Sequence, residues 1–271
     1  MGEFELYEHR YVLSRTEQII EHRFPEAMFD TGRTLLCVPG YAATGESFAR
    51  LRPLASDFDV RLLTINAGRG GNIINQYAAL LARHVSDFER PVLLGASFGG
   101  LVALRAAAQL RRRISGLVLI STYAAVTSRF RRLLIETGIT TAFERVGANV
   151  PRVAYALLGS KRLDDAAAQE LKRERAAIDR REKRARFSAA MHADVRHATA
   201  GLRVPTLIIH GGADRLIPIS AAHELARLIP DSSIVIIGRA GHLPYLTHPG
   251  EVNALLGSFL KARFAGQRAV A

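Results

Sequence analysis

A serine flanked by glycines, in the segment Gly95-Ala96-Ser97-Phe98-Gly99, is the first candidate for chemistry in this chain. An apolar run at 91–94 precedes it, and a helix-favouring stretch of Leu, Val and Ala follows it. When a strand turns this sharply into a helix, the serine is held in a strained conformation with its hydroxyl lifted out of the sheet. The small flanking residues are a steric requirement, because the strand and helix backbones pass close together. Ser97 is therefore the candidate nucleophile.

Asp214 and His242 are the candidate acid and base. A serine hydroxyl is a poor nucleophile at neutral pH, so it needs a general base, and the base needs an orienting partner. Asp214 follows the apolar run 205–210 and a Gly-Gly pair, and His242 follows the apolar run 233–237 and Gly241. Both lie just past a predicted parallel strand, at the sheet edge where Ser97 emerges and where open α/β sheets bind ligands. The order serine, acid, histidine is one of the known orders of a catalytic triad.

Each of these residues also has a plainer interpretation. Asp214 could cap a turn or the following helix, and His242 could be an ordinary loop histidine. Residues 101–135 contain no Asp or Glu, so the other common position for the acid, after the strand that follows the serine helix, is empty. Asp214 is therefore the only well-placed candidate. His210 lies within a strand pattern, and we interpret it as a structural residue.

Two backbone N–H groups are expected to bind the oxyanion that acyl transfer develops. One belongs to Phe98, the residue after the nucleophile. The other belongs to Tyr41, because the predicted strand 34–38 runs into Pro39-Gly40-Tyr41 and Gly40 lets the backbone turn inward. The alternative for this loop is a plain glycine turn with the Tyr41 side chain packed in the core.

The elements that must position these residues read as an α/β fold. Strand-like runs alternate with helical patterns, which favours a mostly parallel central sheet flanked by helices; the runs lie at 34–38, 60–65, 91–95, 116–120, 205–210 and 233–237. We expect one or two antiparallel edge strands from the first thirty residues. No strand pattern occurs between 124 and 204, which predicts a helical lid inserted after the strand that follows the serine helix. The predicted division is 1–123 and 201–271 for the core and 124–200 for the lid.

Composition excludes several classes of protein. The 271 residues are 48% apolar, with a single cysteine, Cys37, so an intramolecular disulfide is excluded. We expect no signal peptide, no membrane span, no metal and no organic cofactor, and a cytoplasmic location. The glycine-rich segment 68–71 is not followed by Lys and Ser or Thr, so a phosphate-binding loop is not supported.

Positive charge gathers in the predicted lid. The net charge is +12, and residues 129–196 carry sixteen Lys and Arg against nine Asp and Glu. This pattern fits a solvated helix face, and some of the arginines have acidic neighbours at helical spacing. It also fits a basic surface that steers an acidic substrate or partner to the site. Nucleic acid fits less well, because no nucleic-acid-binding motif accompanies the charge.

Four segments carry a resemblance to the α/β-hydrolase superfamily, over about residues 34–264 with a divergent middle: Pro39-Gly40-Tyr41, Gly95 to Gly100, His210 to Asp214 and Gly241 to Pro244. The resemblance implies the α/β-hydrolase fold and a serine triad, and its serine nucleophile disfavours the branches that use aspartate. Within the superfamily the chain is most similar to small bacterial carboxylesterases, including pimeloyl-acyl-carrier-protein methyl ester esterases and enol-lactonase and haloperoxidase-like relatives. Pro39 stands where the family more often has histidine, and 66–71 departs from the family's usual turn.

The sequence thus predicts a serine carboxylic-ester hydrolase that works through an acyl-enzyme on a small-molecule or carrier-bound ester. The resemblance points to the methyl ester of an acyl chain held by an acidic acyl carrier protein. The positive charge of the predicted lid indicates that this protein would dock on its arginines: Arg129, Arg131, Arg132, Arg152 and Arg162. The first alternative is a generic small-ester, lactone or thioester hydrolase, or a perhydrolase, with no protein-bound substrate. The second is a non-catalytic ligand-binding module on the same fold.

Overall fold

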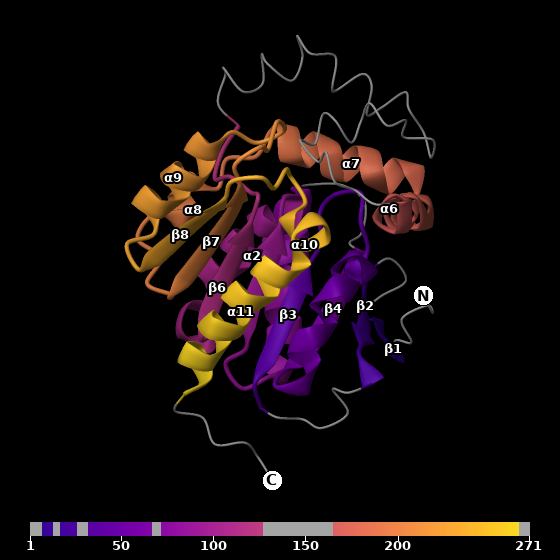
Figure 1. Cartoon of the computed structure of the whole chain (residues 1–271), viewed down its shortest axis with the longest axis horizontal. Helices are drawn as coiled ribbons and strands as arrows, with labels where there is room; N and C mark the ends of the chain where they lie inside the picture. Colours follow the sequence, from indigo (N-terminus) through magenta and orange to yellow (C-terminus); the bar gives the residue numbers. More distant parts are fainter. Residues whose placement is uncertain (1–6, 13–16, 26–31, 67–71, 127–164, 266–271) are drawn as a thin grey trace.

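A single eight-stranded sheet crosses the molecule in the order β1-β2-β4-β3-β5-β6-β7-β8 (Figure 1). The computed structural model describes all residues except 1–6, 13–16, 26–31, 67–71, 127–164 and 266–271. The strands are β1 (Tyr7–Val12), β2 (Gln18–Arg23), β3 (Thr34–Val38), β4 (Asp59–Asn66), β5 (Val92–Ala96), β6 (Gly116–Ile120), β7 (Thr206–Gly211) and β8 (Ser232–Ile237). From β4 to β8 neighbouring strands are parallel, whereas β1 and β2 are antiparallel edge strands, as expected. The predicted α/β fold with a mostly parallel sheet is confirmed.

The central strands are the continuous apolar runs of the sequence. Every residue of β3, β5 and β6 is buried, because helices cover both faces of this part of the sheet. All six predicted strands are present, with ends that differ from the expected ones by at most one residue. The apolar runs therefore located the elements that end at the candidate site.

Two helical layers sandwich the sheet. The helices and 3₁₀ segments are η2 (Gly45–Ser56), α1 (Ile73–His84), η3 (Val85–Asp87), α2 (Phe98–Leu110), η4 (Arg111–Arg113), α6 (Asp165–Ala177), α7 (Arg180–Met191), α8 (Arg196–Thr199), α9 (Ile219–Leu228), α10 (Pro244–Thr247) and α11 (Pro249–Phe264). One apolar core lies between the sheet and α1, α2 and α9, and a second lies between the sheet and η2, α10 and α11. No helix in the described part of the chain is long and apolar enough to span a membrane.

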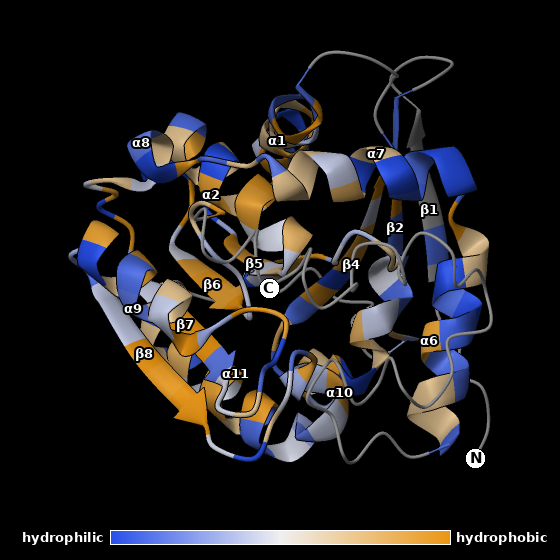
Figure 2. Cartoon of the chain, turned by 90° about the horizontal axis from the view of Figure 1, so that it is seen from above, coloured by the Kyte–Doolittle hydropathy of each residue, from blue (hydrophilic) through white to orange (hydrophobic). Residues whose placement is uncertain are grey.

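Helices α6 and α7 are joined by a short turn and lie above the carboxyl edge of the sheet, where they run in different directions and form the α6–α7 pair (Figure 1, Figure 2). They belong to the interval between β6 and β7 in which the sequence predicted helices. The two helices are separated at Asp179, whose side chain accepts hydrogen bonds from the amides of Arg181 and Glu182 and so begins α7. Figure 2 shows long hydrophilic stretches in both helices. The predicted domain boundaries remain a prediction, since residues 127–164 lie outside the described residues.

Helix α7 contacts the ends of three different strands. Arg186 donates to the carbonyl oxygen of Ile65 near the end of β4, at 3.0 Å. The ring of Phe187 lies 5.5 Å from that of Tyr41, in the loop after β3. The hydroxyl of Tyr123, just after β6, donates to the carbonyl oxygen of Ala190 at 2.8 Å. The helix therefore lies across the sheet edge at which the candidate residues gather.

Candidate active site

Ser97 occupies the sharp turn between β5 and α2. Its backbone has φ 51° and ψ −118°, a conformation that residues with a side chain rarely adopt. The Ser97 amide donates to the carbonyl oxygen of Ile120 at 2.9 Å, and the Thr122 hydroxyl donates to the carbonyl oxygen of Ser97 at 2.7 Å. Hydrogen bonds to the end of the neighbouring strand β6 thus hold the strained residue in place.

Close backbone contact explains the glycines on either side of Ser97. A Cβ atom on Gly95 would lie 2.4 Å from the carbonyl oxygen of Gly99, and one on Gly99 would lie 2.1 Å from the carbonyl oxygen of Val38. Both distances are far below a van der Waals contact. Only glycine lets the first turn of α2 come so near to β3 and β5.

His242 joins Ser97 to Asp214. Its Nε2 lies 3.1 Å from Ser97 Oγ, and its Nδ1 lies 2.9 Å from Asp214 Oδ2. The Asp214 carboxylate can only accept, so Nδ1–H donates to it and Nε2 is left to accept the serine proton. The Asp214 side chain is fully buried and His242 is 4% exposed, whereas Ser97 is partly exposed. The structure therefore brings the three predicted residues together in the hydrogen-bonded order of a serine triad.

A tight turn after β7 holds the acid. The second oxygen of Asp214, Oδ1, accepts from the amides of Leu216 at 2.8 Å and Ile217 at 3.0 Å. His210 Nε2 lies 3.0 Å from the carbonyl oxygen of Ile217 and 3.7 Å from Asp214 Oδ2. Burial lowers the pKa of His210, although the charge of Asp214 and the bond to Ile217 oppose this shift. A neutral His210 therefore fastens the turn without adding a positive charge beside the acid.

The two predicted oxyanion donors lie on either side of the nucleophile. Phe98 is the first residue of α2, so its N–H has no acceptor within the helix and adds to the positive end of the helix dipole. The loop after β3 passes beside Ser97, since a Cβ atom on Gly40 would lie only 3.7 Å from Ser97 Cβ. Tyr41 follows Gly40, so its N–H belongs to the backbone that borders the serine.

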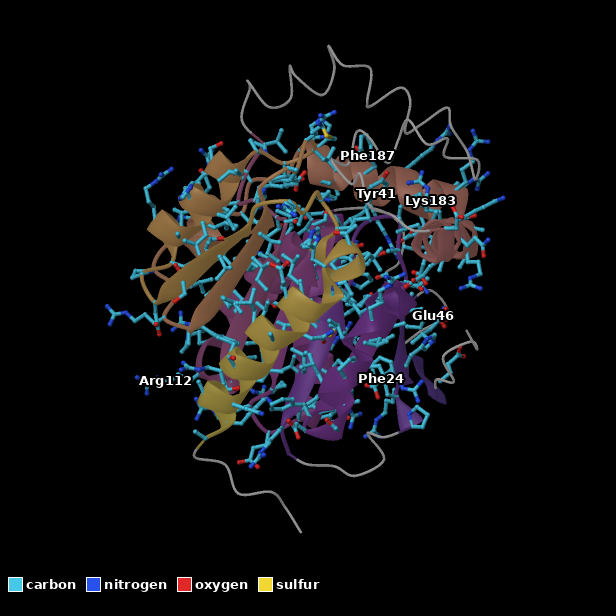
Figure 3. All side chains as sticks on the ribbon, viewed as in Figure 1. Phe24, Tyr41, Glu46, Arg112, Lys183 and Phe187 are labelled. Atoms are coloured by element: carbon cyan, nitrogen blue, oxygen red, sulfur yellow. The ribbon has the colours of Figure 1, made fainter. Side chains whose placement is uncertain are left out.

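The side chains of both predicted donor residues are braced by neighbouring elements. Tyr41 packs against Phe187 of α7 (Figure 3), and burial raises the pKa of its phenol although the charge of Arg175 opposes this shift. Phe98 packs edge-on against Tyr77 of α1, with ring centroids 5.7 Å apart.

The Tyr77 hydroxyl is in turn held by α7. Arg186 Nε donates to it at 2.8 Å, and the hydroxyl itself donates to Glu182. Arg186 is only 2% exposed, and its Nε also lies 3.1 Å from Glu182 Oε1. The α6–α7 pair is thereby linked to both predicted oxyanion donors.

The arginines predicted to dock a carrier protein fall outside the described residues: Arg129, Arg131, Arg132, Arg152 and Arg162. The unusual turn at 67–71 is also outside them. Among the residues that the structure describes, no group of three or more His, Cys, Asp or Glu side chains could hold a metal ion. Cys37 is buried, and burial raises the pKa of its thiol.

Several residues around the site were not predicted from the sequence. Glu174 and Arg186 lie in a stretch that reads as solvated, yet both are buried against the core of the fold. Their partners Thr44 and Tyr77 are more than 100 residues away in the chain. No local pattern could have found these pairs.

Known proteins show the same fold and similar sequences. The pimeloyl-[acyl-carrier protein] methyl ester esterase of Xanthomonas oryzae pv. oryzae is 30% identical over 251 residues, which is 84% of this chain and 95% of that protein. The protein of the same name from Serratia marcescens is 25% identical over 85% of this chain and 94% of its own length. The crystal structure of esterase RhEst1 from Rhodococcus sp. ECU1013 superposes with a TM-score of 0.74, covering 94% of this chain and 98% of that one at 21% identity. A family model matches residues 35–255, and the chain belongs to the alpha/beta hydrolase family.

Proposed function

We propose that the protein is a serine carboxylic-ester hydrolase in which Ser97 is the nucleophile, His242 the general base and Asp214 its orienting acid. The observation that carries this proposal is the continuous chain of contacts from Ser97 Oγ to His242 Nε2 and from His242 Nδ1 to Asp214. A ligand-binding module has no need for a strained serine in contact with a buried histidine and aspartate.

The reaction has two halves. Ser97 Oγ attacks the ester carbonyl carbon as its proton passes to His242 Nε2, and the carbonyl oxygen becomes an oxyanion that accepts from the N–H groups of Tyr41 and Phe98. Collapse of this intermediate breaks the bond to the alcohol, which leaves with the proton from His242. Water then attacks the acyl-enzyme by the same route and releases the carboxylic acid. Asp214 stabilises the imidazolium in both halves.

The test compares the wild-type enzyme with Ser97→Ala on short p-nitrophenyl esters. Loss of the nucleophile should lower kcat by several orders of magnitude. A fluorophosphonate probe should label the wild-type protein at Ser97 and leave the folded Ser97→Ala variant unlabelled. Equal rates for the two proteins would refute the triad, and a folded wild-type protein that neither turns over nor labels would favour the binding module.

For the substrate, we propose the methyl ester of an acyl chain carried by an acidic acyl carrier protein. Two observations support this choice. The relatives from Xanthomonas and Serratia bear the name of that activity. The α6–α7 pair also presents a group of exposed basic residues, which we call the basic corner: Lys172, Arg173, Arg180, Arg181 and Arg184. Such a surface attracts a strongly acidic protein to the edge of the sheet at which Ser97 lies.

A further inference from the structure

One buried carboxylate links α6 to the loop that follows β3. Glu174 is 4% exposed, and its Oε2 accepts from the Thr44 amide at 2.5 Å and from the Thr44 hydroxyl at 2.6 Å. Both donors of Thr44 thus point to the same carboxylate oxygen. One hydrogen bond comes from the backbone and one from the side chain of the same residue, so the contact fixes the position of Thr44.

Thr44 ends the short loop that contains Tyr41. The Ala43 amide donates to the carbonyl oxygen of Gly40 at 3.3 Å, so residues 40–43 form a turn. After it the chain is held to the body of the fold, because the Gly45 amide donates to the Thr64 hydroxyl on β4 at 2.8 Å. Between the end of β3 and this anchor, Glu174 supplies the acceptor for the Thr44 amide. The direction of the Tyr41 N–H therefore depends on where Glu174 holds Thr44.

The residue next to Glu174 contacts the same loop. The charge of Arg175 acts on the phenol of Tyr41, so consecutive residues of α6 interact with Tyr41 and Thr44. The Lys183 ammonium on α7 donates to the carbonyl oxygen of Arg175 at 2.6 Å, which keeps α6 and α7 together. The ring of Phe187 on α7 packs against the ring of Tyr41. The loop is thus held by contacts from both helices.

Burying the Glu174 carboxylate costs free energy that a purely structural contact would not require. A carboxylate buried to this degree is unfavourable unless it is fully hydrogen-bonded, and here Glu46 and Glu170 add like charge nearby. An apolar residue would pack α6 against η2 without that penalty. Only an acceptor can hold the Thr44 amide, which lies three residues from the proposed oxyanion donor.

We propose that Glu174 is a positioning residue of the oxyanion hole: from α6 it holds the 40–44 loop so that the Tyr41 N–H faces the oxyanion formed on the Ser97-bound substrate. The proposal rests on the triad proposed above. It makes the α6–α7 pair part of the catalytic geometry.

The test compares Glu174→Ala with Glu174→Gln, using a short p-nitrophenyl ester and a trifluoromethyl ketone that adds to the serine as a tetrahedral oxyanion. Glu174→Ala should lower kcat roughly tenfold or more with little change in KM, because an oxyanion donor acts only in the transition state. It should also weaken the binding of the ketone by a similar factor. Glu174→Gln retains an oxygen acceptor for Thr44 and should recover most of both losses. Glu170→Ala is the matched control on the same helix, because its carboxylate faces Arg50 at 3.6 Å, and it should leave both unchanged.

Thr44→Val gives an independent arm, because it removes the hydroxyl donor and leaves α6 intact. It should lower kcat in the same direction, and its effect should be smaller in a Glu174→Ala background, since both changes break one contact. The proposal is overturned if folded Glu174→Ala keeps its kcat, if the loss falls on KM alone, or if Thr44→Val leaves kcat unchanged. An active Ser97→Ala protein would instead refute the triad itself.

Discussion

His210 Nε2 lies 3.0 Å from the carbonyl oxygen of Ile217, and the Ile217 amide donates to Asp214 Oδ1 at 3.0 Å. His210, which the sequence indicates to be a structural residue, therefore contacts the turn that holds Asp214 through a single residue, Ile217. The turn that holds the acid is fixed at its far end by a side chain from the strand that precedes it.

Replacing His210 with Leu should therefore affect both stability and activity. The buried carbonyl of Ile217 would lose its donor, which costs about 1–3 kcal/mol of unfolding free energy. The acid turn would loosen, and kcat/KM for a small ester should fall several-fold. His210→Gln, whose amide nitrogen can reach the same carbonyl, should recover part of both losses. Urea unfolding and ester kinetics measure the two effects, with His223→Gln, an exposed position on α9, as the control. A His210→Leu protein as stable and as active as wild type would contradict the assignment.

The basic corner of the α6–α7 pair gives a test of the proposed carrier-bound substrate. Arg173→Glu combined with Arg181→Glu should raise KM for a carrier-bound methyl ester by about tenfold at low salt and leave hydrolysis of a small methyl ester unchanged. Raising the salt from about 0.05 to 0.5 M should reduce this difference, because the attraction is between exposed charges.

Arg112→Glu is the control for this change of charge. Arg112 is also exposed, and it projects from the opposite side of the molecule to Lys183 (Figure 3). It should leave KM for the carrier-bound ester unchanged. If Arg173→Glu with Arg181→Glu changes KM for both substrates alike, or if salt has no effect, the basic corner is only a solvated surface. The enzyme is then a generic small-ester hydrolase.

Glu174 should make stability depend on pH. Burial raises its pKa to about 7, although its hydrogen bonds to Thr44 oppose this shift. Between about pH 4.5 and 7 the folded state then keeps a proton that the unfolded state has released, so stability falls as the pH rises through this window. At 1.36 kcal/mol per pKa unit the full effect is about 3 kcal/mol. Glu174→Gln lacks this titration.

The free energy of unfolding of Glu174→Gln should therefore rise relative to that of wild type from pH 5 to pH 8, as measured by urea unfolding at each pH. Other groups near Glu174 are common to both proteins and cancel in the difference: Glu170 on α6, Glu46 and Arg50 on η2, Tyr245 on α10, and His22, which pairs with Glu46. His210 changes stability in the opposite direction over part of this range and cancels likewise. A difference that stays constant with pH would show that Glu174 does not hold the proton.

Much of the fold and the three triad positions could be predicted because each signal is local. Apolar runs mark the strands, and in a parallel sheet the residues just after such strands meet at one edge, which is why Ser97, Asp214 and His242 could be placed together. The contacts that α6 and α7 make with the rest of the fold could not be predicted in this way. Arg186 and Glu174 have the composition of a solvated helix, and their burial depends on how α6 and α7 cross the sheet edge, which no spacing within the helices encodes.

The left-handed backbone of Ser97 separates what stabilises this protein from what makes it useful. Glycine adopts that conformation at no steric cost, so a Ser97→Gly chain would lose its nucleophile while relieving strain in the turn. Folding alone would then favour the inactive residue at this position. The proposed catalytic role therefore places a serine at a position where the backbone itself favours glycine.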